Sequence, residues 1–326
     1  MSRCLAAVII AILAGAATAA QNEPSLAPAT FLPQWTPQAQ FAGFYIAFEK
    51  GLYRQQGIDL TILTGGPDRS ASQSLQDAQA DFVTLWLSTA IQMRARGVPV
   101  VNVAQLVQRS ALMLVAKKSS GIRTPADLAG KKVAVWDGDF RLQPEAFFKK
   151  FGVKVQTVPL GPSINLFLRD GVVAATAMWY NEYYTLLSSG LNADEITTFF
   201  FDAYDLNFPE DGIYCLQETR SKRPQLVEGF VRATWDGWAY AFAHPDEAID
   251  ITMRYMAAAH VPANRVHQRW MLARMRDLMM RKEGEAAPTA TLARGDYERV
   301  ALQLQESGWI DRIPMFTSFY QPPPGT

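Results

Sequence analysis

Short apolar runs alternate with amphipathic stretches along the first two thirds of the chain. Strand-like runs occupy the ranges 58–63, 81–86, 98–107, 111–116, 131–136, 153–160, 171–178, 195–201 and 213–216. Stretches with the period of a helix lie between many of them, at 70–79, 88–96, 142–151, 163–170 and 179–187. This alternation predicts βαβ units and a largely parallel sheet.

The last third of the chain changes to an almost purely helical pattern, at 224–243, 245–259, 262–282 and 295–307. Trp235, Trp238 and Phe242 fall on one helical face. We interpret that face as core packing because amphipathic faces are normally buried. The methionine-rich face of 266–280 receives the same interpretation, since methionine fills gaps in cores.

The order of these patterns predicts two α/β lobes. We place the first lobe at 28–114 plus 216–326 and the second at 115–215. The chain is expected to cross between them near 112–118 and 212–217. A mature chain of roughly 300 residues is more than one core usually serves, so two domains are expected. Ligand pockets favour the interface between two such domains.

One strand-to-helix junction near the start of the chain stands out. An extended start, Phe31–Trp35, is broken by Pro37, and a helix follows with Phe41, Tyr45, Phe48 and Leu52 on one face. In an open α/β sheet, ligands bind outside the carboxyl ends of strands, where helix-start N–H groups are unpaired. Trp35, Gln38 and Gln40 are therefore candidate ligand-binding residues. The alternative is that Trp35 fills the core and the glutamines face solvent.

Three further junctions of the same kind are expected to face the cleft between the lobes. Their candidate residues are Trp86 and Ser88 at the second junction, Asp137 and Gly138 at the third, and Tyr180, Asn181 and Glu182 at the fourth. Aromatic side chains at junctions offer faces on which a ring can stack, and a carboxylate accepts hydrogen bonds from an amine. The competing interpretations are an ordinary Asp-Gly turn at 137–138 and a helix-start charge at Glu182.

Residues 1–20 have the pattern of a secretory signal. Arg3 is followed by the apolar run 5–13 and by the small-residue site 17–20. We expect cleavage between Ala20 and Gln21, or one residue earlier, and a soluble periplasmic protein. An uncleaved anchor is the alternative, although the apolar run is too short for a permanent span.

Charge and cysteine content limit the functions that are expected. The chain has 31 basic and 31 acidic residues, and cleavage would remove only Arg3 among them, leaving 30 against 31 and a net charge of −1. Nothing in this balance points to nucleic acid, which would require a basic excess or stripe. Cys4 would be removed with the signal, so Cys215 would have no intrachain partner for a disulfide.

The amino-acid sequence of the first junction resembles that of a known family. The segment Trp35-x-Pro37-Gln38-Ala39-Gln40-Phe41-Ala42-Gly43-Phe44-Tyr45-x-Ala47, together with 49–53 and 57–60, is similar to the opening of the NMT1/THI5-like family. The similarity is dense there and looser as far as Cys215. The resemblance implies the type II periplasmic-binding-protein fold, which agrees with the two lobes expected from the pattern.

The resemblance also implies a function. Most such proteins are periplasmic substrate-binding proteins of ABC importers that bind a thiamine pyrimidine precursor, such as hydroxymethylpyrimidine or its formylamino analogue. A tyrosine and a glutamate at the start of the fourth-junction helix hold the aminopyrimidine in that family, which transfers to Tyr180 and Glu182 and less directly to Asn181. We expect a monomer without a cofactor that delivers its ligand to an inner-membrane permease.

An enzyme is the first alternative, because fungal pyrimidine synthases are relatives that carry a histidine and a cysteine-rich motif. Here Phe41 follows Gln40 with no histidine nearby, and the sequence has no cysteine cluster. His244, His260 and His267 all lie in the C-terminal helical region. No catalytic set and no metal-ligand spacing is evident, so we do not expect an enzyme.

Two other binding roles remain open. A sensor ectodomain would carry a transmembrane helix and an output domain, and we expect neither. A binding protein for riboflavin or an aromatic sulfonate would have the same sequence motif at the first junction. A sulfonate would require an arginine in the cleft, and the candidates Arg69 and Arg141 do not lie in a clear anion-binding loop. The sequence therefore favours a neutral or cationic ring.

Overall fold

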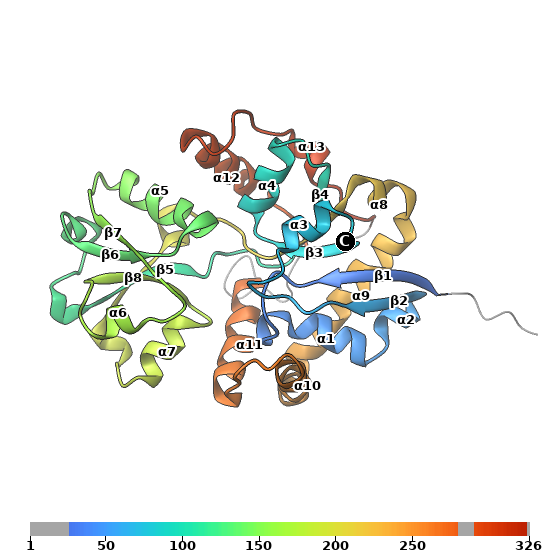
Figure 1. The fold of residues 1–326 in the computed structure, drawn as a ribbon, viewed down its shortest axis with the longest axis horizontal. Helices are drawn as coiled ribbons and strands as arrows, with labels where there is room; N and C mark the ends of the chain where they lie inside the picture. The colour runs from blue at the N-terminus through green and yellow to red at the C-terminus, as the bar shows by residue number, and fades with distance from the viewer. Residues whose placement is uncertain (1–25, 280–289, 325–326) are drawn as a thin grey trace, which may run out of the picture.

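The computed structural model describes residues 26–279 and 290–324 and contains two five-stranded sheets, one in each lobe (Figure 1). The first sheet has the order β2 (Ile58–Ile62), β1 (Ala27–Leu32), β3 (Phe82–Leu85), β10 (Gly212–Leu216) and β4 (Val100–Gln105). The second has the order β7 (Gln156–Pro159), β6 (Lys132–Val135), β8 (Ala174–Met178), β5 (Leu112–Lys117) and β9 (Ile196–Phe200). The expected strands are thus present, and they are divided between two lobes.

Each sheet is mixed, so the expectation of a largely parallel sheet needs correction. The pairs of β1 with β2 and β3, and of β6 with β7 and β8, are parallel. Strand β10 runs antiparallel to β3 and β4, and β5 runs antiparallel to β8 and β9. Both antiparallel strands directly follow a passage from the other lobe. A strand that enters in this way lacks the local helical crossover that would make it parallel.

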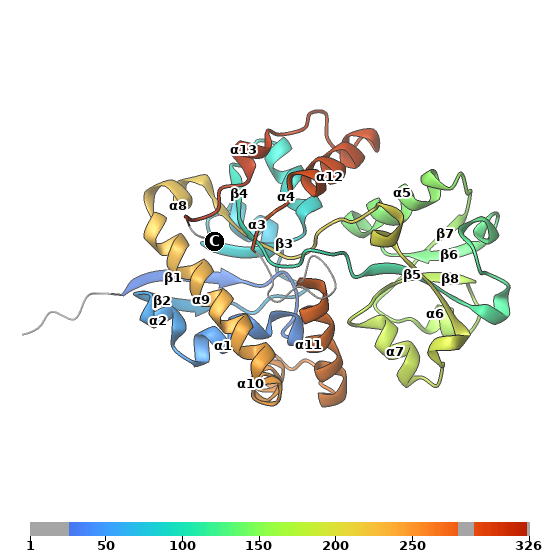
Figure 2. The same ribbon diagram turned by 180° about the vertical axis from the view of Figure 1, so that it is seen from behind.

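Helices cover both faces of each sheet. The first lobe holds α1 (Ala42–Glu49), α2 (Leu52–Gln55), α3 (Ala71–Gln76), α4 (Leu87–Ala95), α8 (Gln217–Lys222), α9 (Pro224–Ala243), α10 (Pro245–Ala258), α11 (Arg265–Met279), α12 (Arg294–Glu306) and α13 (Phe316–Phe319). The second holds α5 (Leu142–Lys150), α6 (Asn165–Leu168) and α7 (Glu182–Ser188). Helices α1, α9, α10 and α11 lie on one side of the first sheet, and α4, α12 and α13 lie on the other (Figure 2). None of the helices in the described ranges is long and apolar enough to span a membrane.

Helices α1 and α9 pack unusually closely in the core of the first lobe. A Cβ atom on Gly43 would lie 2.3 Å from the indole of Trp238, and one on Gly237 would lie 2.2 Å from the carbonyl oxygen of Gly43. Only glycine fits at both positions, so the indole rests on the α1 backbone. Trp238 is 2% exposed, which confirms the core interpretation of its helical face.

The helix after the first junction is interrupted. Helix α1 ends at Glu49 and α2 begins at Leu52, because Gly51 takes the left-handed conformation with φ of 68°. Phe48 is 41% exposed. The prediction of one continuous face through Leu52 was therefore wrong, since the glycine restarts the helix.

The chain passes between the lobes at 106–111 and at 205–211, and we call these stretches the first and second crossing segments. The passages were expected at 112–118 and 212–217, ranges that belong largely to strands β5 and β10. The backbone N–H groups of Leu106 and Val107 donate to the carbonyl of Asp211, at 3.2 and 3.0 Å. The two crossing segments therefore lie side by side and form one joint.

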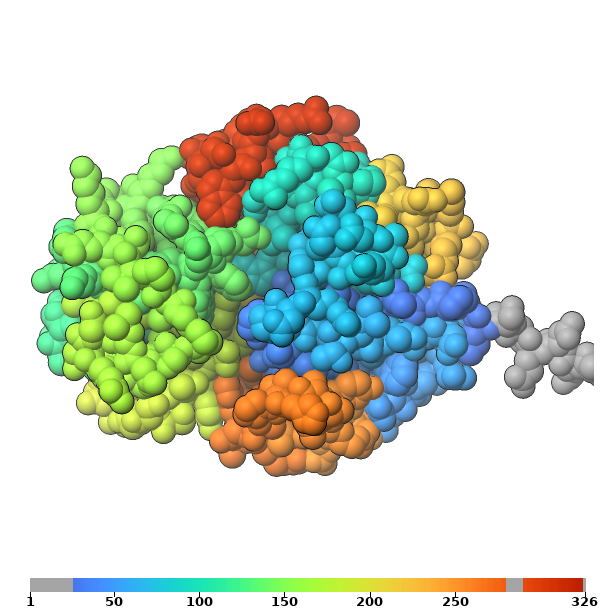
Figure 3. Space-filling model, in the orientation of Figure 1, coloured from blue at the N-terminus to red at the C-terminus, as the bar shows by residue number. Residues whose placement is uncertain are grey.

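The lobes touch on both sides of this joint. Figure 3 shows the second lobe, in green, meeting the first lobe along one seam. At one end of the seam, the Lys149 ammonium lies 2.9 Å from a Glu306 carboxylate oxygen, linking α5 to α12. The side chains that meet along this seam therefore come from separate parts of the sequence.

Candidate ligand-binding site

The second and third junctions meet each other across the seam. The ring of Trp86, the residue before α4, lies edge-on to Phe140 with centroids 4.6 Å apart, and Phe140 lies 5.6 Å from Trp136. The carboxylate of Asp139 accepts hydrogen bonds from the Thr89 hydroxyl and from the Gln92 amide, the latter at 2.9 Å. The start of α4 in the first lobe is thus fastened to the turn after β6 in the second.

The predicted residues of these two junctions differ in their surroundings. Trp86 and Ser88 are buried, at 8% and 4% exposure. Ser88 lies inside the first turn of α4, which begins at Leu87, one residue earlier than the sequence pattern predicted. The Asp137 side chain is 88% exposed and pairs with Arg141, and Gly138 next to it is also exposed. Neither of these two contributes to the contacts that their neighbours make with the first lobe.

The first junction places its glutamines in a buried chain of hydrogen bonds. The Gln38 amide donates to the Gln40 carbonyl oxygen at 2.5 Å, and the Gln40 amide donates to a carboxylate oxygen of Asp211 at 2.7 Å. The Gln34 amide donates to the other carboxylate oxygen. Gln38 and Gln40 are 9% and 4% exposed, so these side chains do not face solvent.

Trp35 does not fill the core. Trp35 is 45% exposed, and its ring stacks on no other aromatic ring within the described ranges. Its backbone is fixed by a close approach, because a Cβ on Gly65 would lie 2.4 Å from the Trp35 carbonyl oxygen. The indole is thus an accessible aromatic surface on a rigid turn.

The fourth junction lies between β8 and α7, and its residues are buried or half-buried. Tyr180 is 4% exposed, while Asn181 and Glu182 are half-buried. The Glu182 carboxylate accepts hydrogen bonds from the Met178 backbone N–H at 2.9 Å and from the Asn181 amide at 2.8 Å. These contacts stabilise the start of α7. They agree with the competing interpretation, in which Glu182 is a helix-start charge. Each carboxylate oxygen can still accept a further bond.

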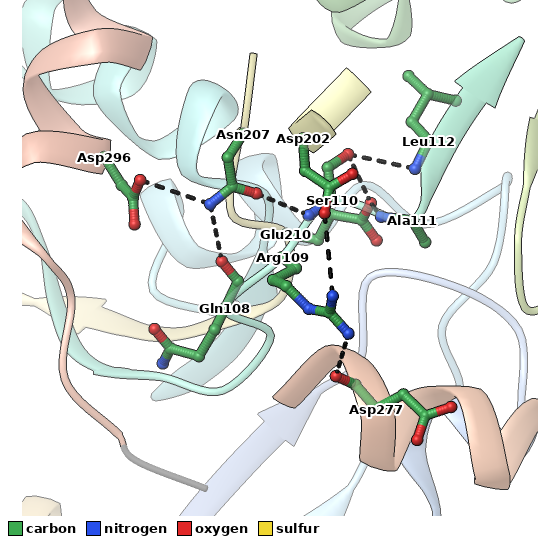
Figure 4. Close-up of polar contacts among 10 residues, drawn as sticks. All are labelled: Gln108, Arg109, Ser110, Ala111, Leu112, Asp202, Asn207, Glu210, Asp277 and Asp296. Atoms are coloured by element: carbon green, nitrogen blue, oxygen red, sulfur yellow. Dashed lines mark hydrogen bonds and ion pairs between the residues drawn. The ribbon is translucent and has the colours of Figure 1, made fainter. Parts of the chain in front are cut away.

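Two buried carboxylates at this site were missed by the sequence reasoning. Glu210 and Asp211 end the second crossing segment and are 1% and 2% exposed. Glu210 accepts hydrogen bonds from the Ala111 backbone N–H and from the Ser110 hydroxyl, which joins the two crossing segments (Figure 4). Two adjacent acidic residues directly before an apolar strand were the available signal.

Burial raises the pKa of all three carboxyl groups. The pKa of Glu182 is raised to about 7 and that of Asp211 to about 7, in both cases mainly by desolvation. The pKa of Glu210 is raised to about 8 by desolvation and, secondarily, by the charge of Asp211. Among the described residues, no basic side chain lies within ion-pair distance of these carboxylates.

Tyr180 is influenced electrostatically by all three carboxylates. Its pKa is raised well above the usual value, first by burial and then by the charges of Glu210, Asp211 and Glu182. Its ring therefore lies within electrostatic reach of all three. Its hydroxyl forms no hydrogen bond with another described residue, although the residue as a whole is 4% exposed. The hydroxyl oxygen itself is not fully buried, so it is open to water or to a ligand.

An arginine braces the joint next to this site. The Arg109 guanidinium donates to the Asp277 carbonyl at the end of α11, at 2.8 Å. It also lies 4.0 Å from the Asp202 carboxylate in the second lobe (Figure 4). The first crossing segment is thus tied to both lobes.

A second contact closes the seam on the side of α11. The indole N–H of Trp270 donates to the Trp179 carbonyl oxygen at 3.0 Å. The Arg274 guanidinium lies 4.7 Å from the centroids of both indole rings, and Tyr184 stacks on His267 at 4.6 Å. Aromatic and cationic side chains from both lobes therefore interleave beside Tyr180.

Two further kinds of site can be judged from the described residues. No group of three or more histidine, cysteine, aspartate or glutamate residues in those ranges is arranged to hold a metal ion. Arg141 pairs with Glu145 at 2.7 Å, and the exposed Arg69 donates to the Thr64 carbonyl at 3.3 Å. Both candidate anion-binding arginines are thus engaged by oxygen atoms of the protein.

Comparison with known proteins gives consistent matches. The sequence model of the family described as NMT1/THI5 like matches residues 38–248, which is more than half of the chain. A riboflavin-binding protein, RibY, from Chloroflexus aurantiacus is 26% identical over 76% of this chain and 71% of its own. A 4-amino-5-hydroxymethyl-2-methylpyrimidine phosphate synthase from Legionella pneumophila is 24% identical over 68% and 72%. A formylaminopyrimidine-binding protein from Halalkalibacterium halodurans is 21% identical over 90% and 89%.

The structure also matches solved structures. The periplasmic aliphatic sulphonate binding protein SsuA from Escherichia coli superimposes with a TM-score of 0.72 at 16% identity, covering 92% of this chain and 93% of that one. At this identity the match concerns the fold alone. It confirms the type II periplasmic-binding-protein fold that the sequence predicted.

Proposed function

The chain belongs to the NMT1/THI5-like family, and from that premise we propose that it is a solute-binding protein that captures a small aromatic heterocycle between its lobes. The ligand we propose is a thiamine pyrimidine precursor, such as hydroxymethylpyrimidine or its formylamino analogue. The observation that carries this proposal is the position of Tyr180 at the seam: the residue is 4% exposed, its hydroxyl oxygen stays open to solvent without a partner among the described residues, and three carboxylates act on it.

The side chains around the seam suit an aminopyrimidine. The rings of Tyr180 and the accessible Trp35 offer faces for offset stacking. Glu182 offers acceptor oxygens to an exocyclic amine and to a protonated ring nitrogen, which form charge-assisted hydrogen bonds. A sulfonate would instead meet buried carboxylates, whose charge repels an anion. The pyrimidine-related names of two relatives point to the same ligand class.

We propose further that the protein works in the periplasm and delivers its ligand to an ABC permease. The expected signal segment 1–20 lies outside the described residues. The fold neighbour SsuA from Escherichia coli is a periplasmic binding protein, which supports this location. N-terminal sequencing of periplasmic material tests it: a mature end near Gln21 is expected, and an intact Met1 on membrane-bound protein would refute it.

Isothermal titration of the purified protein tests the ligand class. The panel is 4-amino-5-hydroxymethyl-2-methylpyrimidine, its formylamino analogue, riboflavin and an alkanesulfonate. We expect a pyrimidine to bind at least tenfold more tightly than the other two compounds. Tighter binding of riboflavin or the sulfonate would replace our assignment. Turnover of histidine with pyridoxal phosphate by the purified protein would show that it is an enzyme.

A further inference from the structure

We propose that Asp211 is a second ligand-binding carboxylate, and that Asp211 and Glu182 together select a ring that is bound as a cation. This inference rests on the proposed function, because it concerns the same seam between the lobes. It adds a residue from the second crossing segment that the resemblance does not supply. It also narrows the ligand from a neutral or cationic ring to a cationic one.

The position of Asp211 is fixed by bonds to its backbone and its side chain. Its carbonyl oxygen accepts the N–H groups of Leu106 and Val107 from the other crossing segment. Its two carboxylate oxygens each accept one amide, from Gln34 and Gln40. Each oxygen retains capacity for another donor. The carboxylate is therefore held rigidly and is not saturated.

The partners of Asp211 orient it without neutralising it. Both side-chain donors are uncharged amides, and the Gln40 amide is itself held by Gln38. Glu210, its neighbour, is used differently, because its bonds to Ala111 and Ser110 hold the two crossing segments together. Among the buried acids at the joint, Asp211 is thus the one held by the residues of the first junction.

Tyr180 supplies an independent sign that a ligand belongs there. The residue is 4% exposed, and its hydroxyl oxygen, which is not fully buried, forms no hydrogen bond with the rest of the described chain. The charges of Asp211 and Glu182 both act on it. A phenol that could donate to either carboxylate and reaches neither is separated from both, and a bound ring with N–H groups would connect all three.

The charge balance at the seam determines whether the bound ring is neutral or cationic. Removing carboxylates from water is costly unless a cation or several donors compensate them. Two arginines at the seam, Arg109 and Arg274, instead contact Asp277 and an aromatic ring. A ligand cation would supply the missing charge. Because Asp211 is bonded to the first lobe and Glu182 belongs to the second, such a ligand would also hold the lobes together.

The test compares two probes that differ in one group. The first is 4-amino-5-hydroxymethyl-2-methylpyrimidine, and the second carries a 4-hydroxyl group in place of the amine, which makes the ring harder to protonate. Asp211→Asn should weaken binding of the amino probe about tenfold to a hundredfold, the range for a hydrogen bond to a charged group. Its affinity for the hydroxy probe should change less than about threefold, since that ring makes no charged pair with Asp211.

Asp205→Asn is the matched control, because Asp205 lies in the same crossing segment with its side chain 90% exposed. It should bind both probes as the wild type does. If Asp211→Asn retains wild-type affinity for the amino probe while Glu182→Gln loses it, Asp211 only holds the joint, and the proposed function stands without this inference. If the wild type binds neither probe, the proposed function fails together with it.

A second measurement keeps the inference testable if Asp211→Asn does not fold. In Glu182→Gln, one of the two carboxylates is neutral. If Asp211 is a second ligand-binding carboxylate, this variant should still bind the amino probe about tenfold more tightly than the hydroxy probe, since Asp211 is unchanged. Equal affinities for the two probes in Glu182→Gln would overturn the inference, because nothing would then remain to distinguish the cationic ring.

Discussion

The indole N–H of Trp270 in α11 donates a hydrogen bond to the backbone carbonyl of Trp179, 3.0 Å away in the other lobe. The Arg274 guanidinium lies 4.7 Å from both indole rings. A bond and a cation–π pair thus connect the lobes at the edge of the seam, beside the residue that precedes Tyr180. This contact can form only when the lobes are together, so it contributes to the balance between closed and open forms.

We predict that Trp270→Phe shifts the unliganded protein toward an open form. The substitution keeps an aromatic ring but removes the N–H, and the lost hydrogen bond is worth about 0.5–1.5 kcal/mol. Small-angle scattering should show a larger radius of gyration for the variant. Ligand affinity should fall about twofold to tenfold, since more of the binding energy is used to close the lobes. Trp235→Phe in α9 is the control, and an identical radius in both variants would exclude a latch role for Trp270.

We predict that ligand makes the wild-type protein more compact. The lobes are joined by two crossing segments that lie side by side, an arrangement that permits hinge motion. A ligand that touches both lobes binds the closed form better and therefore increases its population. Scattering curves measured with and without the pyrimidine should differ in radius of gyration. An unchanged radius at saturating ligand would remove the hinge hypothesis.

The buried carboxyl groups predict that the unliganded protein is less stable at pH 8.5 than at pH 5.5. The pKa values of Glu182, Asp211 and Glu210 are raised to about 7, 7 and 8 in the folded protein. The folded state therefore keeps protons that the unfolded chain releases near pH 4–4.5, and stability falls as the pH rises through the raised values. His267, whose pKa is lowered by burial, acts in the opposite direction below pH 6.5, but as one group against three.

Melting temperatures measured across pH 5–9 check this prediction. Asp211→Asn removes one of the three groups, so its curve should be flatter than that of the wild type, and Asp205→Asn should leave the slope unchanged. A wild-type melting temperature that rises steadily from pH 5.5 to pH 8.5 would show that these carboxyl groups are not desolvated as the structure indicates.

The fold was predictable because its signals are local, whereas the site depends on contacts between distant segments. The pattern around Pro224–Ala243 specified helix α9 to the residue, since a proline start and a long amphipathic repeat are read directly. The bond between Gln40 and Asp211 joins residues 171 positions apart, and no spacing rule connects them. The acidic pair at 210–211 was overlooked for this reason, because its importance comes from the glutamines that it meets.

The sequence also specified residue types more reliably than their surroundings. Gln38 and Gln40 were selected at the first junction, and they are buried there, but their partner could not be inferred. Asp137 was selected because it lies at the third junction, which was expected to face the cleft, yet its side chain is 88% exposed, and Asp139, two residues further on, contacts the first lobe. A difference of one or two positions within a turn determines which side chain faces the seam. Sequence patterns do not predict the turn that accurately.

The last prediction concerns stacking and separates the two lobes' contributions to binding. Trp35 is 45% exposed in the first lobe, and Tyr180 is buried in the second. If a pyrimidine stacks on Trp35, Trp35→Ala should weaken binding at least tenfold, through lost apolar area and lost ring contact. Its melting temperature without ligand should match the wild type, because a half-exposed indole contributes little to the core. Glu182→Gln should weaken binding about tenfold to a hundredfold through loss of the charged bond. Calorimetry on both variants decides the matter. If Trp35→Ala binds as tightly as the wild type, Tyr180 alone supports the ring, and the first lobe acts on the ligand only through its polar groups.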